Sequence, residues 1–208
     1  MPFRNREEAA DLLTKRLEKF RGVHPVVLAI PRGAVHMGRL IADNLGCDLD
    51  VVLVRKIGAP DEPELALGSI AENGEIFLND FARTYPRDVI EQKADEAMAL
   101  IKKRRQKYST HHKPIALQGR VVIIVDDGVA TGATVLSAIH AVKKENPIKI
   151  VVATPVAPPR VREKLNRECD ELIILSEPED FFSVGQFYKE FPQVQDEEVS
   201  RYLYDNRP

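Results

Sequence analysis

The sequence lacks most of the features that would place a protein in a membrane, in an oxidising compartment or on nucleic acid. Its two cysteines, Cys47 and Cys169, are too few for a disulfide framework and fit a reducing compartment. The 30 basic and 32 acidic residues leave a net charge of −2, which argues against broad electrostatic binding of nucleic acid. No apolar run approaches the ~20 residues of a membrane-spanning helix, and the N-terminus is charged from Arg4 onward, unlike a signal peptide. These absences predict a cytoplasmic protein without a membrane partner.

Two motifs of common enzyme classes are also absent. The chain has no Gly-x-Ser-x-Gly motif, which disfavours a serine hydrolase, and no Gly-x4-Gly-Lys-Ser/Thr motif, which disfavours a P-loop nucleotidase. What is present is ordinary for a globular protein: 208 residues, of which 44% are hydrophobic and 30% are charged. This length predicts a single domain over residues 1–208 with a full hydrophobic core.

Short apolar runs alternate with segments of helical periodicity. Residues 26–30 (VVLAI) and 121–125 (VVIIV) are continuously apolar, as strands buried in a parallel sheet are. Asn5 followed by Glu8 resembles a helix capping box, and Gly46 is expected to end a second helix. The alternation predicts an α/β fold with a parallel sheet. Strands are expected at residues 26–30, 51–54, 65–71, 75–78, 121–125, 148–153 and 172–175, and helices after Asn5, from about Ala34, at 86–108, 132–144, from 158 and at 196–203.

Three loops leave predicted strands at their carboxyl ends, where parallel α/β sheets bind ligands. They comprise residues 31–34, 55–63 and 126–134. One glycine and two prolines within residues 56–63 indicate irregular structure there, and Asn73-Gly74 is typical of a tight hairpin turn. The fold by itself therefore predicts that the three loops converge.

Residues 121–134 (VVIIVDDGVATGAT) combine a buried strand, two acids and a loop of small residues that leads into a helix. Small residues let backbone N–H groups at a helix N-terminus approach a phosphate, and the hydroxyls of Thr131 and Thr134 can donate further hydrogen bonds. Asp126 and Asp127 are unsuited to an anion but can accept hydrogen bonds from a vicinal diol. This pattern points to a ribose 5-phosphate. The simpler alternative is that the acids only cap a turn.

This segment resembles the phosphoribosyl-pyrophosphate signature of type I phosphoribosyltransferases. The resemblance implies that Asp126 and Asp127 bind the ribose hydroxyls. It also implies that the 5-phosphate is bound by a run of small residues, namely Ala130, Thr131, Gly132, Ala133 and Thr134. Gly128 stands where the family usually has an aliphatic residue, which predicts a more flexible loop.

Two further segments resemble parts of the same family. Residues 29–33 (AIPRG) are similar to the pyrophosphate loop, which makes Arg32 and Gly33 candidate pyrophosphate ligands. Residues 52–58 (VLVRKIG) are similar to the Arg-Lys segment of adenine phosphoribosyltransferases. By that resemblance Arg55 and Lys56 are catalytic and stabilise charge on the leaving pyrophosphate. The alternative for all three basic residues is solvated loop charge.

The resemblance implies a parallel sheet flanked by helices, with a core at about residues 22–175, a flexible lid hairpin at about 56–80 and a C-terminal hood at about 176–208. It implies transfer of a phosphoribosyl group to a nitrogenous small-molecule acceptor, with release of pyrophosphate. Mg²⁺ is the expected cofactor, bound mainly through the substrate with Asp126 and Asp127 as candidate protein ligands. A homodimer is also implied. The alternative function is a non-catalytic regulatory protein that senses phosphoribosyl pyrophosphate.

The acceptor is not identified by the sequence. Hypoxanthine-guanine enzymes of the family have an aspartate where this chain has Ala130, which disfavours a 6-oxopurine handled in that way. Aromatic residues of the hood could stack on a base or could form a small core that holds the tail in place; they are Phe181, Phe182, Phe187 and Tyr188.

Overall fold

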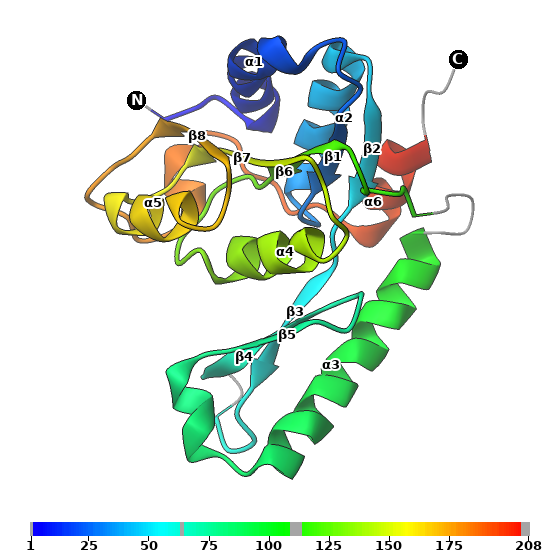
Figure 1. The fold of residues 1–208 in the computed structure, drawn as a ribbon. Helices are drawn as coiled ribbons and strands as arrows, with labels where there is room; N and C mark the ends of the chain where they lie inside the picture. Colours follow the sequence, from blue (N-terminus) through cyan, green and yellow to red (C-terminus); the bar gives the residue numbers. More distant parts are fainter. Residues whose placement is uncertain (1, 63–64, 109–113, 205–208) are drawn as a thin grey trace.

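The computed structural model describes residues 2–62, 65–108 and 114–204. Its centre is a five-stranded sheet of order β2-β1-β6-β7-β8, in which all neighbouring strands run parallel (Figure 1). The strands are β1 (Val26–Ala29), β2 (Asp48–Val51), β6 (Val121–Val125), β7 (Lys149–Val156) and β8 (Glu171–Ser176). The predicted parallel α/β architecture is confirmed.

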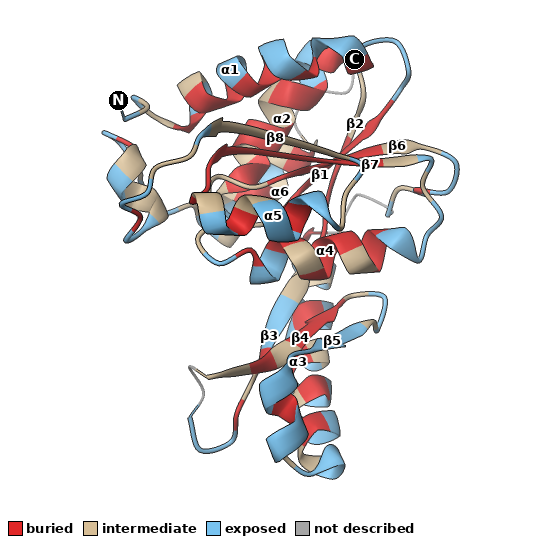
Figure 2. Ribbon diagram, turned by 60° about the vertical axis from the view of Figure 1, so that its left-hand side comes forward, coloured by how far each residue is buried: buried red, intermediate tan, exposed pale blue. Residues whose placement is uncertain are grey.

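Helices cover both faces of this sheet, in agreement with the wholly apolar sequences of β1 and β6 (Figure 2). Successive side chains of β6 point to opposite faces. Ile123 packs into the core that includes α1, α2 and α6, and Ile124 packs into the core that includes α4 and α5. These helices are α1 (Arg6–Leu17), α2 (Ala34–Leu45), α4 (Ala133–Lys143), α5 (Pro159–Asn166) and α6 (Asp196–Tyr204).

The predicted helix ends are confirmed where a specific side chain or glycine sets them. The Asn5 side chain accepts a hydrogen bond from the Glu8 backbone N–H at 3.1 Å and caps α1. Gly46 ends α2 with a left-handed φ of 64°, which most other residues adopt only at a cost. Among the described residues, no helix is both long enough and apolar enough to cross a membrane.

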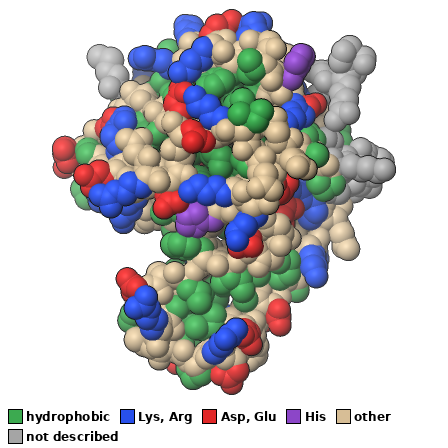
Figure 3. Space-filling model, in the orientation of Figure 1, with side chains coloured by type: hydrophobic (Ala, Val, Ile, Leu, Met, Phe, Trp, Pro, Cys, Tyr) green, Lys and Arg blue, Asp and Glu red, His purple; other side chains and the backbone are tan. Residues whose placement is uncertain are grey.

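A second, antiparallel sheet lies beside the first and has the order β3-β4-β5. It contains β3 (Val54–Gly58), β4 (Ala66–Ala71) and β5 (Ile76–Leu78), and the long helix α3 (Arg87–Tyr108) packs against it (Figure 1). The predicted hairpin turn is confirmed, with Gly74 at a φ of 88°. Hydrophobic side chains are visible on the surface of this part (Figure 3), and its large exposed ones among the described residues are Ile76, Phe77, Leu78, Phe81 and Leu100.

Two predictions about the connection between the sheets were wrong. Residues 51–54 do not form one strand: β2 ends at Val51, and β3 begins at Val54 in the other sheet. Val52 and Leu53 are buried because the chain crosses between the two sheets there. Residues 56–58, expected in a loop, continue β3 because they pair with β4 across Lys56–Ser69 and Ile57–Gly68. Long-range pairing thus prevails over the local glycine and proline signals.

Candidate functional site

The loop between β6 and α4 presents two acids and an open helix N-terminus at the carboxyl edge of the sheet. Asp126 and Asp127 follow Val125 directly, and the Asp127 backbone N–H donates to Asp126 Oδ1 at 2.9 Å. Gly132, at a φ of 83°, makes the turn into α4. Thr131, which precedes Gly132, and Thr134, in the first turn of that helix, are both exposed. The N–H groups there can therefore reach an anion from solvent.

Burial disfavours the charged form of both acids. Loss of hydration, together with the neighbouring Asp127 charge, raises the pKa of Asp126 well above its usual value. Burial also raises the pKa of Asp127, although the charge and hydrogen bond of Arg6 oppose that shift. An acid pair held in this way favours a ligand that donates hydrogen bonds or carries positive charge.

Arg6 is a site residue that the sequence did not indicate. Its Nε donates to Asp127 Oδ2 at 2.8 Å, and the two side chains are 9% and 15% exposed. The same guanidinium donates to the Pro192 carbonyl at 2.7 Å and lies 3.8 Å from the centre of the Phe191 ring. Since 121 positions separate Arg6 from Asp127, no local pattern could have revealed this pair.

The C-terminal segment closes over the same acid. Tyr188 donates its hydroxyl to the Asp127 carbonyl at 2.6 Å. A Cβ at Gly128 would lie 2.3 Å from Val184 Cγ1, so this position has no room for a larger residue. The departure from the family pattern at Gly128 therefore accommodates the tail. The segment before α1 also pairs with the C-terminal segment here, because the Phe3 backbone N–H donates to the Phe187 carbonyl at 2.8 Å.

The loop after β1 lies against the acids, as predicted. A Cβ built on Gly33 would lie 1.9 Å from Asp127 Oδ2, so only glycine permits this approach. Arg32 is exposed beside it. The residues predicted to bind pyrophosphate and those predicted to bind ribose are thus brought together at one sheet edge.

The structure separates the two basic residues of the Arg-Lys segment. Arg55 lines a small cavity of about 40 Å³ together with Pro31 and Thr134, so it lies beside both predicted phosphate-binding loops. Lys56 is the next residue of β3, and alternate residues of a strand point to opposite faces. Arg55 is therefore better placed than Lys56 to act at this edge.

The hairpin predicted as a lid is docked on α4 in this structure. The hydroxyls of Ser69 and Ser137 are hydrogen-bonded to each other, and Asn73 Nδ2 donates to the Ala141 carbonyl at 3.0 Å. Opening and closing of residues 56–80, of which 63 and 64 lie outside the described residues, stays a prediction.

The aromatic residues of the predicted hood have different environments. Phe181 and Tyr188 are buried, and Phe181 packs against Phe187 with ring centres 4.9 Å apart. These rings hold the tail in place. Phe182 is 90% exposed and is the most accessible of these rings.

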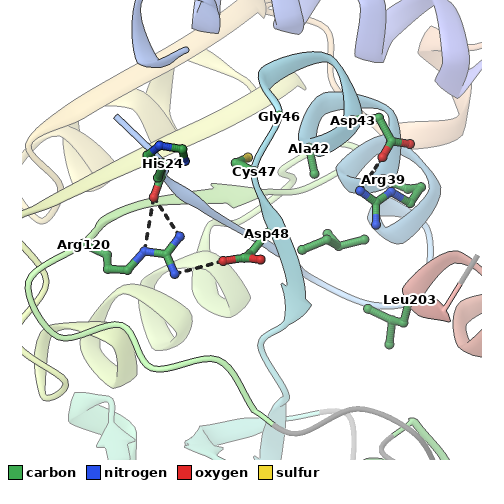
Figure 4. Close-up of a pocket in the computed structure, with 10 residues that line it drawn as sticks. His24, Arg39, Ala42, Asp43, Gly46, Cys47, Asp48, Arg120 and Leu203 are labelled. Atoms are coloured by element: carbon green, nitrogen blue, oxygen red, sulfur yellow. Dashed lines mark hydrogen bonds and ion pairs between the residues drawn. The ribbon is translucent and has the colours of Figure 1, made fainter. Parts of the chain in front are cut away.

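A larger cavity, of about 540 Å³, lies at the opposite edge of the sheet (Figure 4). Its charged side chains already have partners. Arg120 donates to the His24 carbonyl and to Asp48, and Arg39 forms an ion pair with Asp43. Burial raises the pKa of the Cys47 thiol to about 12, so this cysteine is not an activated nucleophile. Size alone therefore does not identify the functional site.

The chain resembles a known protein family and several known proteins over most of its length. The sequence matches the family described as phosphoribosyl transferase domain over residues 4–189. It is 38% identical over 204 residues to the Mycobacterium tuberculosis protein Rv0571c, a match that covers 97% of this chain and 46% of the relative. The chain thus spans about half the length of the curated relatives it matches.

Solved structures are similar over nearly the whole chain. The protein TT1426 from Thermus thermophilus has a TM-score of 0.86 at 43% identity, with 98% of each chain covered. A purine phosphoribosyltransferase from Pyrococcus horikoshii has a TM-score of 0.52 at 18% identity, covering 91% of this chain and 92% of the other. The second likeness concerns the fold alone.

Proposed function

The chain belongs to the phosphoribosyl transferase family, and on that premise we propose that it transfers a phosphoribosyl group from 5-phosphoribosyl-1-pyrophosphate to a nitrogenous small molecule. The observation that carries the proposal is the acid pair Asp126 and Asp127 beside the open N-terminus of α4. One half of this arrangement accepts hydrogen bonds from a diol, and the other half donates them to a phosphate. A ribose 5-phosphate needs both.

The basic residues nearby supply what the departing pyrophosphate needs. As the bond to ribose C1 breaks, negative charge grows on pyrophosphate and positive charge on the sugar ring. Arg32 and Arg55 can stabilise the first, and the carboxylates of Asp126 and Asp127 lie on the side of the second. The incoming nitrogen then forms the new bond to C1 as pyrophosphate leaves.

Mg²⁺ fits this site as a cofactor carried mainly by the substrate. Among residues 2–62, 65–108 and 114–204, no cluster of three or more potential metal-binding side chains occurs. Mg²⁺ usually needs only one or two carboxylates when phosphates supply the other oxygens. Asp126 and Asp127 would hold it, and it would neutralise charge on the pyrophosphate.

The acceptor is expected between the sheet edge and the C-terminal segment. Ala130 offers no proton-transferring group to a base, so a 6-oxopurine that depends on an aspartate there is disfavoured. Exposed Phe182 could stack on a flat acceptor. A homodimer is part of the proposal, and analytical ultracentrifugation tests it.

The direct test is pyrophosphate release from phosphoribosyl pyrophosphate and Mg²⁺ with a panel of nitrogenous bases. Release that depends on one base supports the transferase. Ligand-dependent thermal stabilisation without turnover for any base would instead favour the sensing protein. If phosphoribosyl pyrophosphate neither binds nor reacts, both functions are wrong.

A further inference from the structure

A second arginine, besides Arg55, borders the small cavity between the two predicted phosphate-binding loops. This cavity is lined by Pro31 after β1, Thr134 at the start of α4, Arg55 of β3 and Arg104 of α3. Arg104 belongs to a run of basic residues on α3 that resembles a solvated helix face in sequence. The fold instead directs this member of the run toward the site.

Arg104 is held loosely, whereas its neighbour in sequence is fixed. Arg105 donates to Glu72, to Asp50 at 3.0 Å and to the Val51 carbonyl at 2.9 Å, so its guanidinium is fully engaged in joining α3 to the sheet. Among the described residues, Arg104 has one salt bridge, to Asp196, with 3.9 Å between Nε and the carboxylate oxygen. Its side chain is 38% exposed and can turn toward a ligand.

The arginines near the cavity have fewer acidic partners among the described residues than their number of positive charges. Within the described part of the chain, neither Arg32 nor Arg55 forms a salt bridge or hydrogen bond through its side chain. Arg32 lies close enough to act on Asp196: burial raises the pKa of that acid, but the Tyr108 hydrogen bond and the charges of Arg104, Lys107 and Arg32 bring it below its usual value. The charges of Arg32 and Arg104 thus both act on the Asp196 carboxylate.

We propose that Arg104 is a pyrophosphate-binding residue that completes a three-arginine site with Arg32 and Arg55. The inference rests on the proposed function and assigns to that site a contact from α3. Guanidinium groups can bind oxygens of two phosphate groups at once, which suits pyrophosphate. The ribose side of the site has its own cation, because Arg6 is paired with Asp127. When pyrophosphate binds, the Arg104 side chain leaves Asp196 and contacts the ligand.

The test compares Arg104→Gln with Lys103→Gln, which removes the same charge from an exposed position one residue away. Pyrophosphate with Mg²⁺, and separately ribose 5-phosphate, are titrated calorimetrically into each protein at about 0.15 M salt. We expect Arg104→Gln to weaken pyrophosphate binding about tenfold, or about 1.4 kcal/mol, with ribose 5-phosphate binding unchanged. Lys103→Gln should change either affinity less than about twofold, since screening weakens distant surface charge.

Two outcomes overturn the inference while leaving the proposed function intact. One is that both variants bind pyrophosphate with equal affinity. The other is that Arg104→Gln loses affinity equally for pyrophosphate and for ribose 5-phosphate. If the unaltered protein binds neither ligand, the proposed function fails and the inference fails with it. Unfolding temperatures of both variants check that they fold. Arg104→Lys should bind pyrophosphate with intermediate affinity, because lysine keeps the charge without the planar fork.

Discussion

Both edges of the parallel sheet carry arginines and acids. These side chains form ion pairs at one edge and are only partly paired at the other. At the amino edge, the arginines and acids of the 540 Å³ cavity are paired with one another (Figure 4). At the carboxyl edge, Asp127 is paired with Arg6, but Asp126, Arg32 and Arg55 form no salt bridge among the described residues. The pKa values of both acids are raised there. The comparison teaches that unbalanced charge, and not cavity size, distinguishes the candidate site.

The largest difference between the edges should appear when acids are neutralised. Asp126→Asn combined with Asp127→Asn should weaken binding of phosphoribosyl pyrophosphate at least about 100-fold. Each charge-assisted hydrogen bond contributes about 1.5–3 kcal/mol, and about 1.4 kcal/mol is a factor of ten. Calorimetric titration measures the affinity. Asp43→Asn with Asp48→Asn is the matched pair at the amino edge and should bind normally; equal losses in both pairs would contradict the comparison.

A second difference concerns the stability of the two arginine–acid pairs. Arg6→Gln leaves a largely buried carboxylate without its cation and should lower the free energy of unfolding by about 3 kcal/mol. Arg39→Gln should cost about 1 kcal/mol or less, because its partner Asp43 is 42% exposed and Arg39 Nε has no hydrogen-bond partner among the described residues. Urea denaturation measures both. Similar costs would show that Arg6 is not needed to compensate Asp127.

Glycine substitutions provide a third comparison. Gly33→Ala places a methyl group against Asp127 and should cost about 1–3 kcal/mol of stability, with weaker binding of phosphoribosyl pyrophosphate. Gly46→Ala strains a left-handed residue but meets no atom within 4 Å. It should cost about 1 kcal/mol and leave affinity unchanged. Denaturation and calorimetry together separate the two, and an unchanged affinity in Gly33→Ala would remove the loop after β1 from the site.

Phosphoribosyl pyrophosphate is expected to have its smallest effect at Cys47, in the amino-edge cavity. Its pKa of about 12 keeps the thiol protonated at pH 8, so alkylation by iodoacetamide should be at least about 100-fold slower than in the unfolded chain. The rate should rise about tenfold for each pH unit above pH 8, because the small thiolate fraction increases by that factor. Cys169→Ser isolates this thiol. Phosphoribosyl pyrophosphate should not alter the rate, and strong protection by it would place a ligand at the wrong edge.

Local sequence predicted well those parts of the fold whose structure is set by neighbouring residues. Strand β6 was predicted at the residues it occupies, and the Asn5 cap and the Gly46 stop were correct. The prediction failed at residues 51–58. The apolar run 51–54 connects two sheets instead of forming one strand, and residues 56–58, expected in a loop, belong to β3. Pairing with β4, which lies later in the chain, decided that outcome.

The sequence alone determined the chemistry of the loop between β6 and α4, because strand, acids, small residues and helix start are consecutive and need only short-range geometry. Only the tertiary structure decided which distant side chains surround that loop. It brought Arg6 and Tyr188 to Asp127, turned Arg55 rather than Lys56 toward the cavity and aimed Arg104 at the same place. These contacts depend on packing between segments that are far apart in the chain, and residue periodicity carries no information about such distances.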